Sequence, residues 1–461
     1  MGPGLYTDGH RLLILWQGQF INLNHMGIHV RLLRSCLAVV CLLLPLLAVA
    51  PSASSATESV DGTASAAASA RSNAEARRAA YKPPLGAVFT NPFSNGRVIM
   101  RQVHRAIHST PNGQFVRLVV WNYDDPAITN ALLRAHERGV HVQVVVAQTT
   151  RNPQWGRLHK ALARNPNDRS FARKCHGACR SKSRIMHAKI FLFSKAGTRK
   201  NITMFGSTNL TLAAGNRQWN DQTTTANEGL YDYFVERFKE YAADKPIHDA
   251  GVDYEVDDYR VTLFPRPNAN PMADAFRQVT CIGADTGYGN ARGRTIVRLA
   301  IAGWFDDFGT DIARAVRKLY NAGCDIRIVT TLAGRGVNRA LRYGRGAVPI
   351  RQVSIDQNKD KVPEYYLHMK SVSINGVYEG DTSASVVFTG SPNWSERARN
   401  SDEVWIRIMG WRELTRSYQS QVDRLFTSKV SHPRMEALRR PQHSGSSARG
   451  SSDTPYWYEL D

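Results

Sequence analysis

Apolar residues recur in two long segments of the chain with the same order of periodicities. Residues 115–146, FVRLVVWNYDDPAITNALLRAHERGVHVQVVV, begin with an apolar run, pass an Asp-Asp turn and continue with apolar residues at helical spacing. Gly139 then precedes a second apolar run, as expected where a helix ends. Residues 296–329 repeat this pattern, with Gly323 at the corresponding position. Each segment therefore predicts a strand, an amphipathic helix and a second strand.

Strands that alternate with helices form βαβ units, which build largely parallel sheets. The duplicated pattern predicts an α/β fold with two similar lobes, each a mostly parallel or mixed sheet flanked by helices. A chain of 461 residues also exceeds the size at which a single core stops growing. We expect a disordered linker at 57–81, a first lobe at 82–250, a second lobe at 251–440 and a flexible tail at 441–461.

The N-terminal region has the pattern of a secretory signal. Two arginines precede an apolar run from Leu37 to Ala50, and small residues follow it. This run is shorter than the roughly 20 apolar residues that a membrane-spanning helix needs. We therefore expect residues 1–56 to be a signal segment of a secreted protein, with Met26 as an alternative start and an uncleaved anchor as the alternative interpretation.

A polar motif follows each repeated segment at the same distance along the chain. His187 and His368 are separated by as many residues as Val116 and Val297, which lie in the repeated strands. In each copy a His-x-Lys sequence is followed by a Gly-Ser turn and an asparagine. The motif residues are His187, Lys189, Ser207 and Asn209 in the first copy, and His368, Lys370, Ser391 and Asn393 in the second.

In an extended strand the side chains of residues i and i+2 lie on the same face, so each His-x-Lys places an imidazole beside an ammonium group. The Gly-Ser turn can bring a hydroxyl and an amide to the same place, which gives donors for phosphate oxygens. The structural alternative is a pair of hydrogen-bonded histidines at strand ends, with glycines for tight turns. The ordered duplication favours a functional site.

These residues resemble the paired HKD motifs of the phospholipase D superfamily, in which His-x-Lys, four further residues and Asp precede Gly-Ser or Gly-Gly and Asn. The resemblance spans essentially the whole predicted folded region. It implies two α/β lobes related by pseudo-two-fold symmetry, with both motifs meeting at one site. It also implies phosphodiester chemistry with no cofactor and no metal.

The chain departs from the family pattern at the motif Asp, which is replaced by Ser194 in the first copy and Asn375 in the second. In the family this Asp is mainly a structural support. Its double replacement leaves open a catalytically silent protein that binds anionic polymers.

The resemblance further implies an acidic residue after each Asn that hydrogen-bonds a motif histidine and fixes its tautomer. In the second half Asp402 or Glu403 fits this role. The first half offers Asp221, or Gln222 where an acid is expected. The unequal candidates suggest that the two histidines have different roles.

The implied mechanism is a double displacement in which one imidazole attacks phosphorus, the other protonates the leaving alcohol, and water cleaves the phosphohistidine. The usual family assignment makes His187 the nucleophile and His368 the acid. The remaining motif residues would bind the substrate or stabilise charge on the phosphoryl oxygens. Charge stabilisation is expected from Lys189, Lys370, Asn209 and Asn393, and substrate binding from Ser207 and Ser391.

The cysteines and tryptophans bear on neighbouring structure. Cys175 and Cys179 stand just before the first motif and favour a disulfide, with half of a zinc site as the alternative; Cys281 and Cys324 would form a second disulfide. Core packing is the expected role of three tryptophans near the repeat landmarks, Trp121, Trp304 and Trp394.

A net charge of +21 points to an anionic partner, with a basic composition that only maintains solubility as the alternative. The densest basic stretch, 164–189, leads into His187 and could steer an anionic substrate, or could be a solvated loop. The leading hypothesis is a secreted phospholipase D-type phosphodiesterase that acts on glycerophospholipid headgroups at a phospholipid membrane surface. A secreted metal-independent nuclease acting on nucleic acid is the alternative. No obligate protein partner is inferred.

Overall fold

The computed structural model describes residues 4–8, 11–16, 19–22, 69, 72–342 and 346–433. The chain divides into two compact units, Met1–Ser65 and Ala66–Asp461. In the first unit, β1 (Gly4–Asp8), β2 (Arg11–Trp16) and β3 (Gln19–Asn22) form an antiparallel sheet. Most of the predicted signal segment, with its apolar run, and the predicted tail lie outside the described residues. Within the described part, no helix has the length and apolar character needed to cross a membrane.

The second unit contains two mixed sheets. The first has the strand order β4-β11-β9-β8-β5-β6-β7, in which β5, β6 and β7 are parallel and the other pairs are antiparallel. Its strands are β4 (Gly86–Phe89), β5 (Phe115–Val120), β6 (His141–Val146), β7 (Phe171–Lys174), β8 (Lys189–Ala196), β9 (Arg199–Gly206) and β11 (Asp221–Thr225).

The second sheet repeats this plan around three parallel strands, β15, β16 and β17, with β19, β20 and β21 continuing it in antiparallel order. Strand β10, from the first half of the chain, joins its edge by pairing with β18. The strands are β10 (Gln218–Trp219), β12 (Asp253–Val256), β13 (Tyr259–Leu263), β14 (Val279–Thr280), β15 (Ile296–Trp304), β16 (Asp325–Ala333), β17 (Ile350–Ile355), β18 (Tyr365–Leu367), β19 (Lys370–Tyr378), β20 (Asp381–Gly390), β21 (Val404–Met409) and β22 (Ser431–His432).

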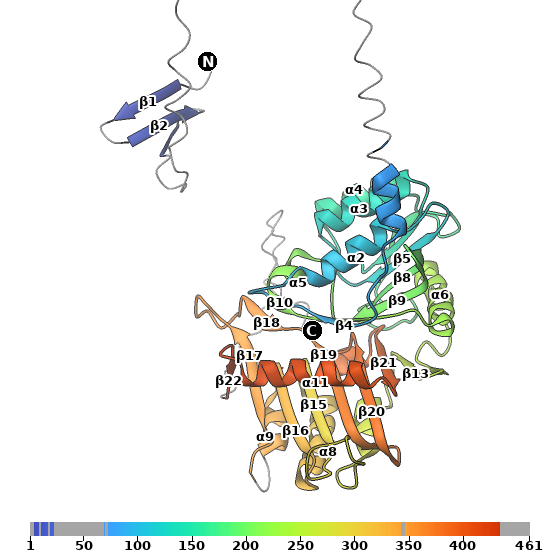
Figure 1. The fold of residues 1–461 in the computed structure, drawn as a ribbon, viewed down its shortest axis with the longest axis vertical. Helices are drawn as coiled ribbons and strands as arrows, with labels where there is room; N and C mark the ends of the chain where they lie inside the picture. Colours follow the sequence, from blue (N-terminus) through green and yellow to red (C-terminus); the bar gives the residue numbers. More distant parts are fainter. Residues whose placement is uncertain are drawn as a thin grey trace, which may run out of the picture. The chain divides into compact units, whose positions relative to one another are not determined.

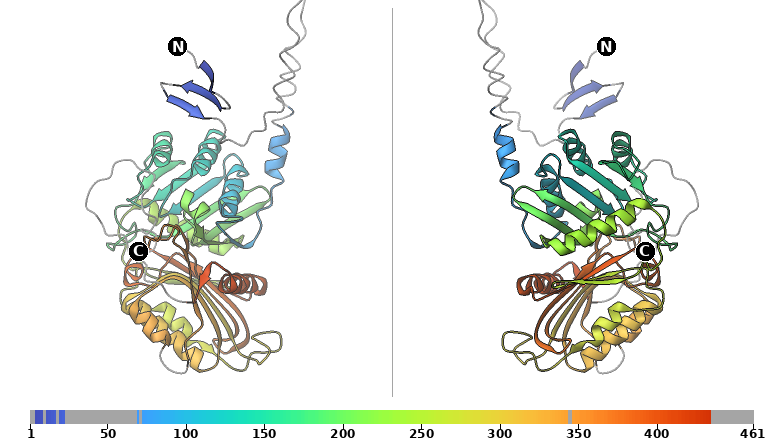
Figure 2. Two further views of the ribbon diagram at one scale, coloured as in Figure 1. Left: turned by 90° about the vertical axis from the view of Figure 1, so that its left-hand side faces the viewer. Right: turned by 90° about the vertical axis from the view of Figure 1, so that its right-hand side faces the viewer.

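Helices cover the outer faces of both sheets, and two further helices contribute to a core shared by the lobes (Figures 1 and 2). Helices α2, α3 and α4 pack on the first sheet, and α7, α8 and α9 pack on the second. The shared core contains apolar residues of α6 and α11. The helices are α2 (Val98–His108), α3 (Pro126–Glu137), α4 (Pro153–Ala161), α5 (Leu212–Asn216), α6 (Glu228–Ala243), α7 (Pro271–Arg277), α8 (Asp306–Asn321), α9 (Arg335–Arg342), α10 (Glu396–Arg399) and α11 (Arg412–Thr427).

The predicted repeat is confirmed, because β5, α3 and β6 correspond to β15, α8 and β16. Helix α3 begins where Asp125 caps it, accepting hydrogen bonds from the backbone N–H groups of Ala127 and Ile128 at 2.8 and 3.1 Å. It ends before Gly139, whose φ of +86° is in the left-handed region that favours glycine. The prediction of two α/β lobes with mixed sheets is therefore confirmed.

The segment predicted to be a disordered linker differs from this expectation at its C-terminal end. Residues 72–79 are helical. Their sequence, SNAEARRA, is rich in Ala, Arg and Glu, which have high helix propensity, and the absence of large apolar residues does not prevent a helix. Tyr81, the last residue of the predicted linker, is buried beneath Arg105 of α2.

Candidate active site between the two lobes

Each His-x-Lys motif lies where a central strand begins. Lys189 is the first residue of β8 and pairs with Val120 at the end of β5. Lys370 is the first residue of β19 and pairs with Ile301 near the end of β15. The four side chains His187, Lys189, His368 and Lys370 are all buried, and none is more than 2% exposed. The duplicated fold thus places two imidazoles and two ammonium groups in the interior.

The Gly-Ser turns bring a neighbouring strand unusually close. A Cβ atom on Gly206 would lie 2.5 Å from the carbonyl oxygen of Asp221, and one on Gly390 would lie 2.0 Å from that of Val404. Glycine is therefore required at both positions. The close approach lets the backbone N–H of Ser207 donate to Asp221 O at 3.1 Å, and that of Ser391 to Val404 O at 3.0 Å.

The two lobes exchange equivalent backbone contacts at the site. The backbone N–H of His187 donates to the carbonyl oxygen of Asp402, in the second lobe, at 2.9 Å. The backbone N–H of His368 donates to the carbonyl oxygen of Trp219, in the first half of the chain, also at 2.9 Å. Because the two exchanges are equivalent, the backbone contacts at the site follow the pseudo-two-fold symmetry that the family resemblance implied.

Each of these two carbonyl groups is followed in the chain by a residue whose side chain orients the histidine of the other lobe. Glu403 faces His187, with its two carboxylate oxygens 2.8 and 2.9 Å from Nδ1. Asn220 occupies the equivalent place for His368, with Oδ1 2.8 Å from Nδ1. Of the acids considered from the sequence, Glu403 is the one that contacts a motif histidine through its side chain.

The other two predicted orienting acids are placed elsewhere and their expected role is corrected. Asp402 accepts a hydrogen bond from the backbone N–H of Arg180 at 2.8 Å. Asp221 accepts from the hydroxyl of Tyr418 at 2.7 Å and from that of Thr389. The orienting residue is the one directly after the residue whose carbonyl oxygen bonds the histidine backbone. Neighbouring side chains of an extended chain point to opposite faces, so Asp402 and Asp221, each one residue away from an orienting residue, point away from the histidines.

The serine hydroxyls, for which substrate binding is expected from the sequence, hydrogen-bond neighbouring groups of this chain. Ser207 donates to Asn220 Oδ1 at 2.9 Å and accepts from the backbone N–H of Asp221 at 3.0 Å. Ser391 accepts from the backbone N–H of Val404 at 3.0 Å and donates to the carbonyl oxygen of Val404 at 3.4 Å. Ser207 therefore holds the residue that orients His368, and Ser391 holds the residue that follows Glu403.

Several polar atoms of the motifs have no hydrogen-bond partner within the described part of the chain, although they are buried. They are His187 Nε2, Asn209 Nδ2, and both side-chain polar atoms of Asn393. Buried polar groups of this kind are uncommon and call for an explanation, such as a ligand. The lysine ammonium groups donate to backbone carbonyls, Lys189 to His187 O at 2.6 Å and Lys370 to His368 O at 2.7 Å.

Burial and nearby cations shift the titration of the first histidine and its carboxylate. Burial, assisted by the charges of Lys189 and Lys370, lowers the pKa of His187 well below its ordinary value. Burial raises the pKa of Glu403 to about 7, against the opposing charge of Lys189. Because Lys370 comes from the second lobe, its effect on His187 places both motifs in one electrostatic environment. A neutral His187 that donates from Nδ1 to Glu403 has its lone pair on Nε2.

Trp121 is buried in the core, as the sequence favoured, and it also contacts a motif histidine. It follows β5 and packs edge-on against His187 with the ring centroids 5.1 Å apart. The ammonium of Lys189 lies 5.7 Å from its ring. Its position directly after the first repeated strand was the available signal. Trp304 and Trp394 do pack in the core, against each other, with centroids 4.8 Å apart.

The substituted motif positions lie away from the histidines, along the same strands. Ser194, near the end of β8, accepts from the backbone N–H of Phe115 at 2.8 Å and donates to Gln114 at 2.9 Å. Asn375, in β19, lies opposite Ile296. Both are at the strand ends remote from Lys189 and Lys370, so neither takes part in the contacts described above.

Both predicted disulfides, Cys175–Cys179 and Cys281–Cys324, are present. Among the described residues, one group of potential metal ligands includes the first pair together with Asp244. Its sulfur atoms are bonded to each other, so they are not available as thiolates. In the basic stretch before His187, Arg180 is fully buried and bonds Glu240 at 2.8 Å, whereas Lys182 and Arg184 are exposed.

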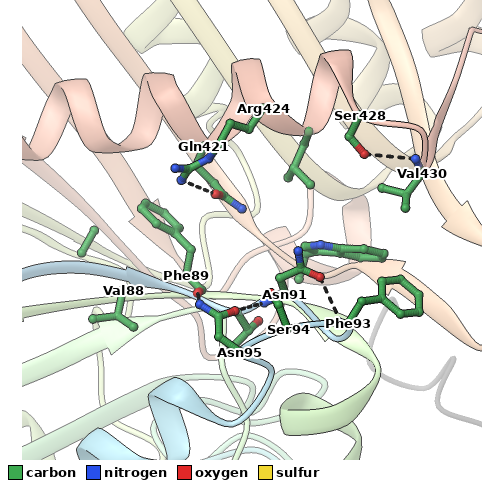
Figure 3. A pocket seen from close by; sticks show the side chains of 14 residues that line it. Val88, Phe89, Asn91, Phe93, Ser94, Asn95, Gln421, Arg424, Ser428 and Val430 are labelled. Carbon is green, nitrogen blue, oxygen red and sulfur yellow. Dashed lines mark hydrogen bonds between the residues drawn. The ribbon is translucent and has the colours of Figure 1, made fainter.

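A cavity of about 510 Å³ lies beside the site, between β4 with its following loop and α11 (Figure 3). Trp219, whose carbonyl holds His368, forms part of its wall. Phe93, 54% exposed, packs against Trp219 and Tyr365. The motif residues with their histidines, lysines, serines and asparagines are not among its lining residues.

Several known proteins are similar to parts of this chain. Residues 104–242 match the family model described as cardiolipin synthase, PLD-like domain. Among solved structures, a phosphatidylserine synthase from Haemophilus influenzae is 11% identical, with a TM-score of 0.49 and coverage of 78% of this chain and 91% of that one. Nuc from Salmonella typhimurium, a phospholipase D family member, is 21% identical, with a TM-score of 0.27 and coverage of 35% and 94%.

A polyphosphate kinase from Porphyromonas gingivalis is 15% identical, with a TM-score of 0.48 and coverage of 74% of this chain. This chain spans half the length of that kinase. No curated protein matches the chain.

Proposed function

Because its PLD-like domain makes this chain a member of the phospholipase D superfamily, we propose that it is a secreted phosphodiesterase that hydrolyses glycerophospholipid headgroups through a phosphohistidine intermediate. The observation that carries the proposal is the pair of buried histidines, each held at Nδ1 by a residue of the other lobe. This arrangement keeps Nε2 of each ring as the reacting atom.

In the first step Nε2 of His187 attacks phosphorus, a P–N bond forms, and the P–O bond to the leaving alcohol breaks. His368 gives its proton to the departing oxygen. In the second step His368 takes a proton from water, the resulting hydroxide attacks phosphorus, and the P–N bond breaks. His187 is thereby restored and the phosphate ester is released.

The groups proposed to stabilise the phosphoryl oxygens are the two lysines and the two asparagines of the motifs. Lys189 and Lys370 supply positive charge, and the amides of Asn209 and Asn393 supply donors that the described residues leave unpartnered. Such preorganised donors in a buried site stabilise developing negative charge more effectively than solvent does.

Nucleic acid is the second candidate substrate, which the net charge of +21 favours. Phosphatidylcholine vesicles, plasmid DNA and bis(p-nitrophenyl) phosphate should therefore be offered to the purified protein in the presence of EDTA. We expect choline release that is abolished in His187→Ala. Nicked DNA without choline release would favour the nuclease, and inertness toward all three substrates, with binding retained, would overturn the phosphodiesterase proposal.

A further inference from the structure

The residue that orients His368 is an amide, whereas the residue that orients His187 is a carboxylate. Asn220 and Glu403 occupy equivalent places, since each directly follows a carbonyl that bonds a histidine backbone N–H across the lobes. Asn220 is fully buried. The presence of Asn220 in place of a carboxylate therefore changes the charge beside His368, while the backbone contacts between the lobes are the same for both histidines.

The surroundings of Asn220 are built for an amide. Its Nδ2 donates to the carbonyl oxygen of Ala214 at 3.3 Å and to Gln218 Oε1 at 2.9 Å. A backbone carbonyl can only accept, so the amide nitrogen must face Ala214. An aspartate here would place an oxygen against that carbonyl oxygen and would lose both hydrogen bonds.

This fixed amide determines the tautomer of His368. With Nδ2 facing Ala214, Oδ1 faces Nδ1 of His368 at 2.8 Å and also accepts from the hydroxyl of Ser207. An amide oxygen can only accept, so Nδ1 of His368 carries a hydrogen in both its neutral and protonated forms. The exchangeable proton of His368 is therefore the one on Nε2.

The two orienting residues stabilise different charge states. A nucleophilic histidine becomes positively charged as it bonds to phosphorus, and a neighbouring carboxylate stabilises that charge. A histidine that donates a proton loses its positive charge in the same step, and a neutral amide fixes its orientation without stabilising the cation that must disappear. The arrangement thus matches the carboxylate to the nucleophile and the amide to the acid.

We propose that Asn220 is a positioning residue that makes His368 the proton donor to the leaving alcohol, while Glu403 makes His187 the nucleophile. The inference rests on the proposed phosphodiesterase function, and it assigns the two roles from contacts within this chain. Asn220 acts through His368 and need not touch the substrate.

The test compares leaving groups in single-turnover reactions. p-Nitrophenolate leaves without a proton, whereas an alkyl alcohol requires one. In Asn220→Ala, release of an alkyl alcohol from an alkyl diester should fall at least about tenfold, and release of the first p-nitrophenolate from bis(p-nitrophenyl) phosphate should change less than about threefold. Glu403→Gln should slow both reactions by a similar factor. Ser207→Ala, which removes one hydrogen bond to Asn220, should give a weaker form of the Asn220→Ala pattern.

Gln102→Ala removes a buried amide of α2 that donates to Pro84 O at 3.3 Å and to Thr224 at 3.0 Å instead of to a motif residue. It is the matched control, expected to preserve the wild-type ratio between the two substrates. Equal losses on both substrates in Asn220→Ala, or a selective loss in Glu403→Gln instead, would overturn the assignment. Nitrogen-detected NMR of His368 in the wild-type protein gives a readout that does not need turnover, since Nδ1–H should be the populated tautomer. A protein with this tautomer but no diester cleavage would refute the proposed function; a protein that cleaves diesters but lacks this tautomer would refute the inference.

Discussion

Replacing Glu403 by glutamine tests the contact that orients the nucleophile. The carboxylate oxygens lie 2.8 and 2.9 Å from His187 Nδ1, and the carboxylate is 2% exposed. Glutamine has the same length and can still accept a hydrogen bond through its carbonyl oxygen, so the substitution removes mainly the charge. A hydrogen bond to a charged group contributes about 1 to 1.5 kcal/mol more than a neutral one.

Because the charge on His187 develops in the transition state, this difference should appear in kcat. It corresponds to a decrease of about fivefold to thirteenfold. The assay is hydrolysis of bis(p-nitrophenyl) phosphate at saturating substrate, followed by p-nitrophenolate absorbance, at a pH above the value of about 7 to which the pKa of Glu403 is raised, so that the carboxylate is charged. Asp402→Asn is the matched control, because the adjacent carboxylate bonds Arg180 and not a histidine. A Glu403→Gln enzyme with unchanged kcat, or equal losses in both variants, would refute the reasoning.

Three further predictions concern stability. Gly390→Ala should reduce the free energy of unfolding, measured in urea, by about 3 kcal/mol, because the added Cβ would lie 2.0 Å from Val404 O. Gly156→Ala in α4 is the control, since its Cβ would enter open space and should cause no loss. Removing the Cys281–Cys324 disulfide, which joins residues 43 apart, by Cys281→Ser should cost about 4 kcal/mol; an unchanged denaturation midpoint would contradict this. Burial raises the pKa of Asp402 to about 6, above its ordinary value of 3.8. Between these two pH values the folded state binds more protons at Asp402 than the unfolded state does, so the contribution of Asp402 to the free energy of unfolding falls as the pH rises. The stability of Asp402→Asn relative to wild type should therefore increase from pH 4 to pH 6, and a constant difference would count against the shift.

The repeated elements could be predicted because their signals are local. Helix α3 follows a capping Asp125 and a proline and ends before Gly139, so its bounds are encoded within a few residues. The His-x-Lys spacing likewise places both side chains on one face of a strand by the pleat alone. The disulfides also followed from pairing the four cysteines after residue 56.

The choice of orienting residue depends on contacts that are distant in the sequence. Whether Asp402 or Glu403 faces His187, and whether Asn220 or Asp221 faces His368, depends on the register between the lobes. That register is set by long-range contacts such as β10 with β18, which sequence periodicity does not specify. The sequence pattern also favoured an acid beside His368, whereas Asn220 has the same geometry without charge.

The central claim is that His187 attacks phosphorus in a site shared by both lobes. It is tested most directly by quenching a single turnover of a diester labelled with ³²P in the retained phosphate ester and mapping the labelled peptide. We predict acid-labile label on His187, its absence in His187→Ala, and its accumulation when water attack is slowed in His368→Ala with bis(p-nitrophenyl) phosphate as substrate. Label on His368, or diester turnover that survives in His187→Ala, would contradict the claim.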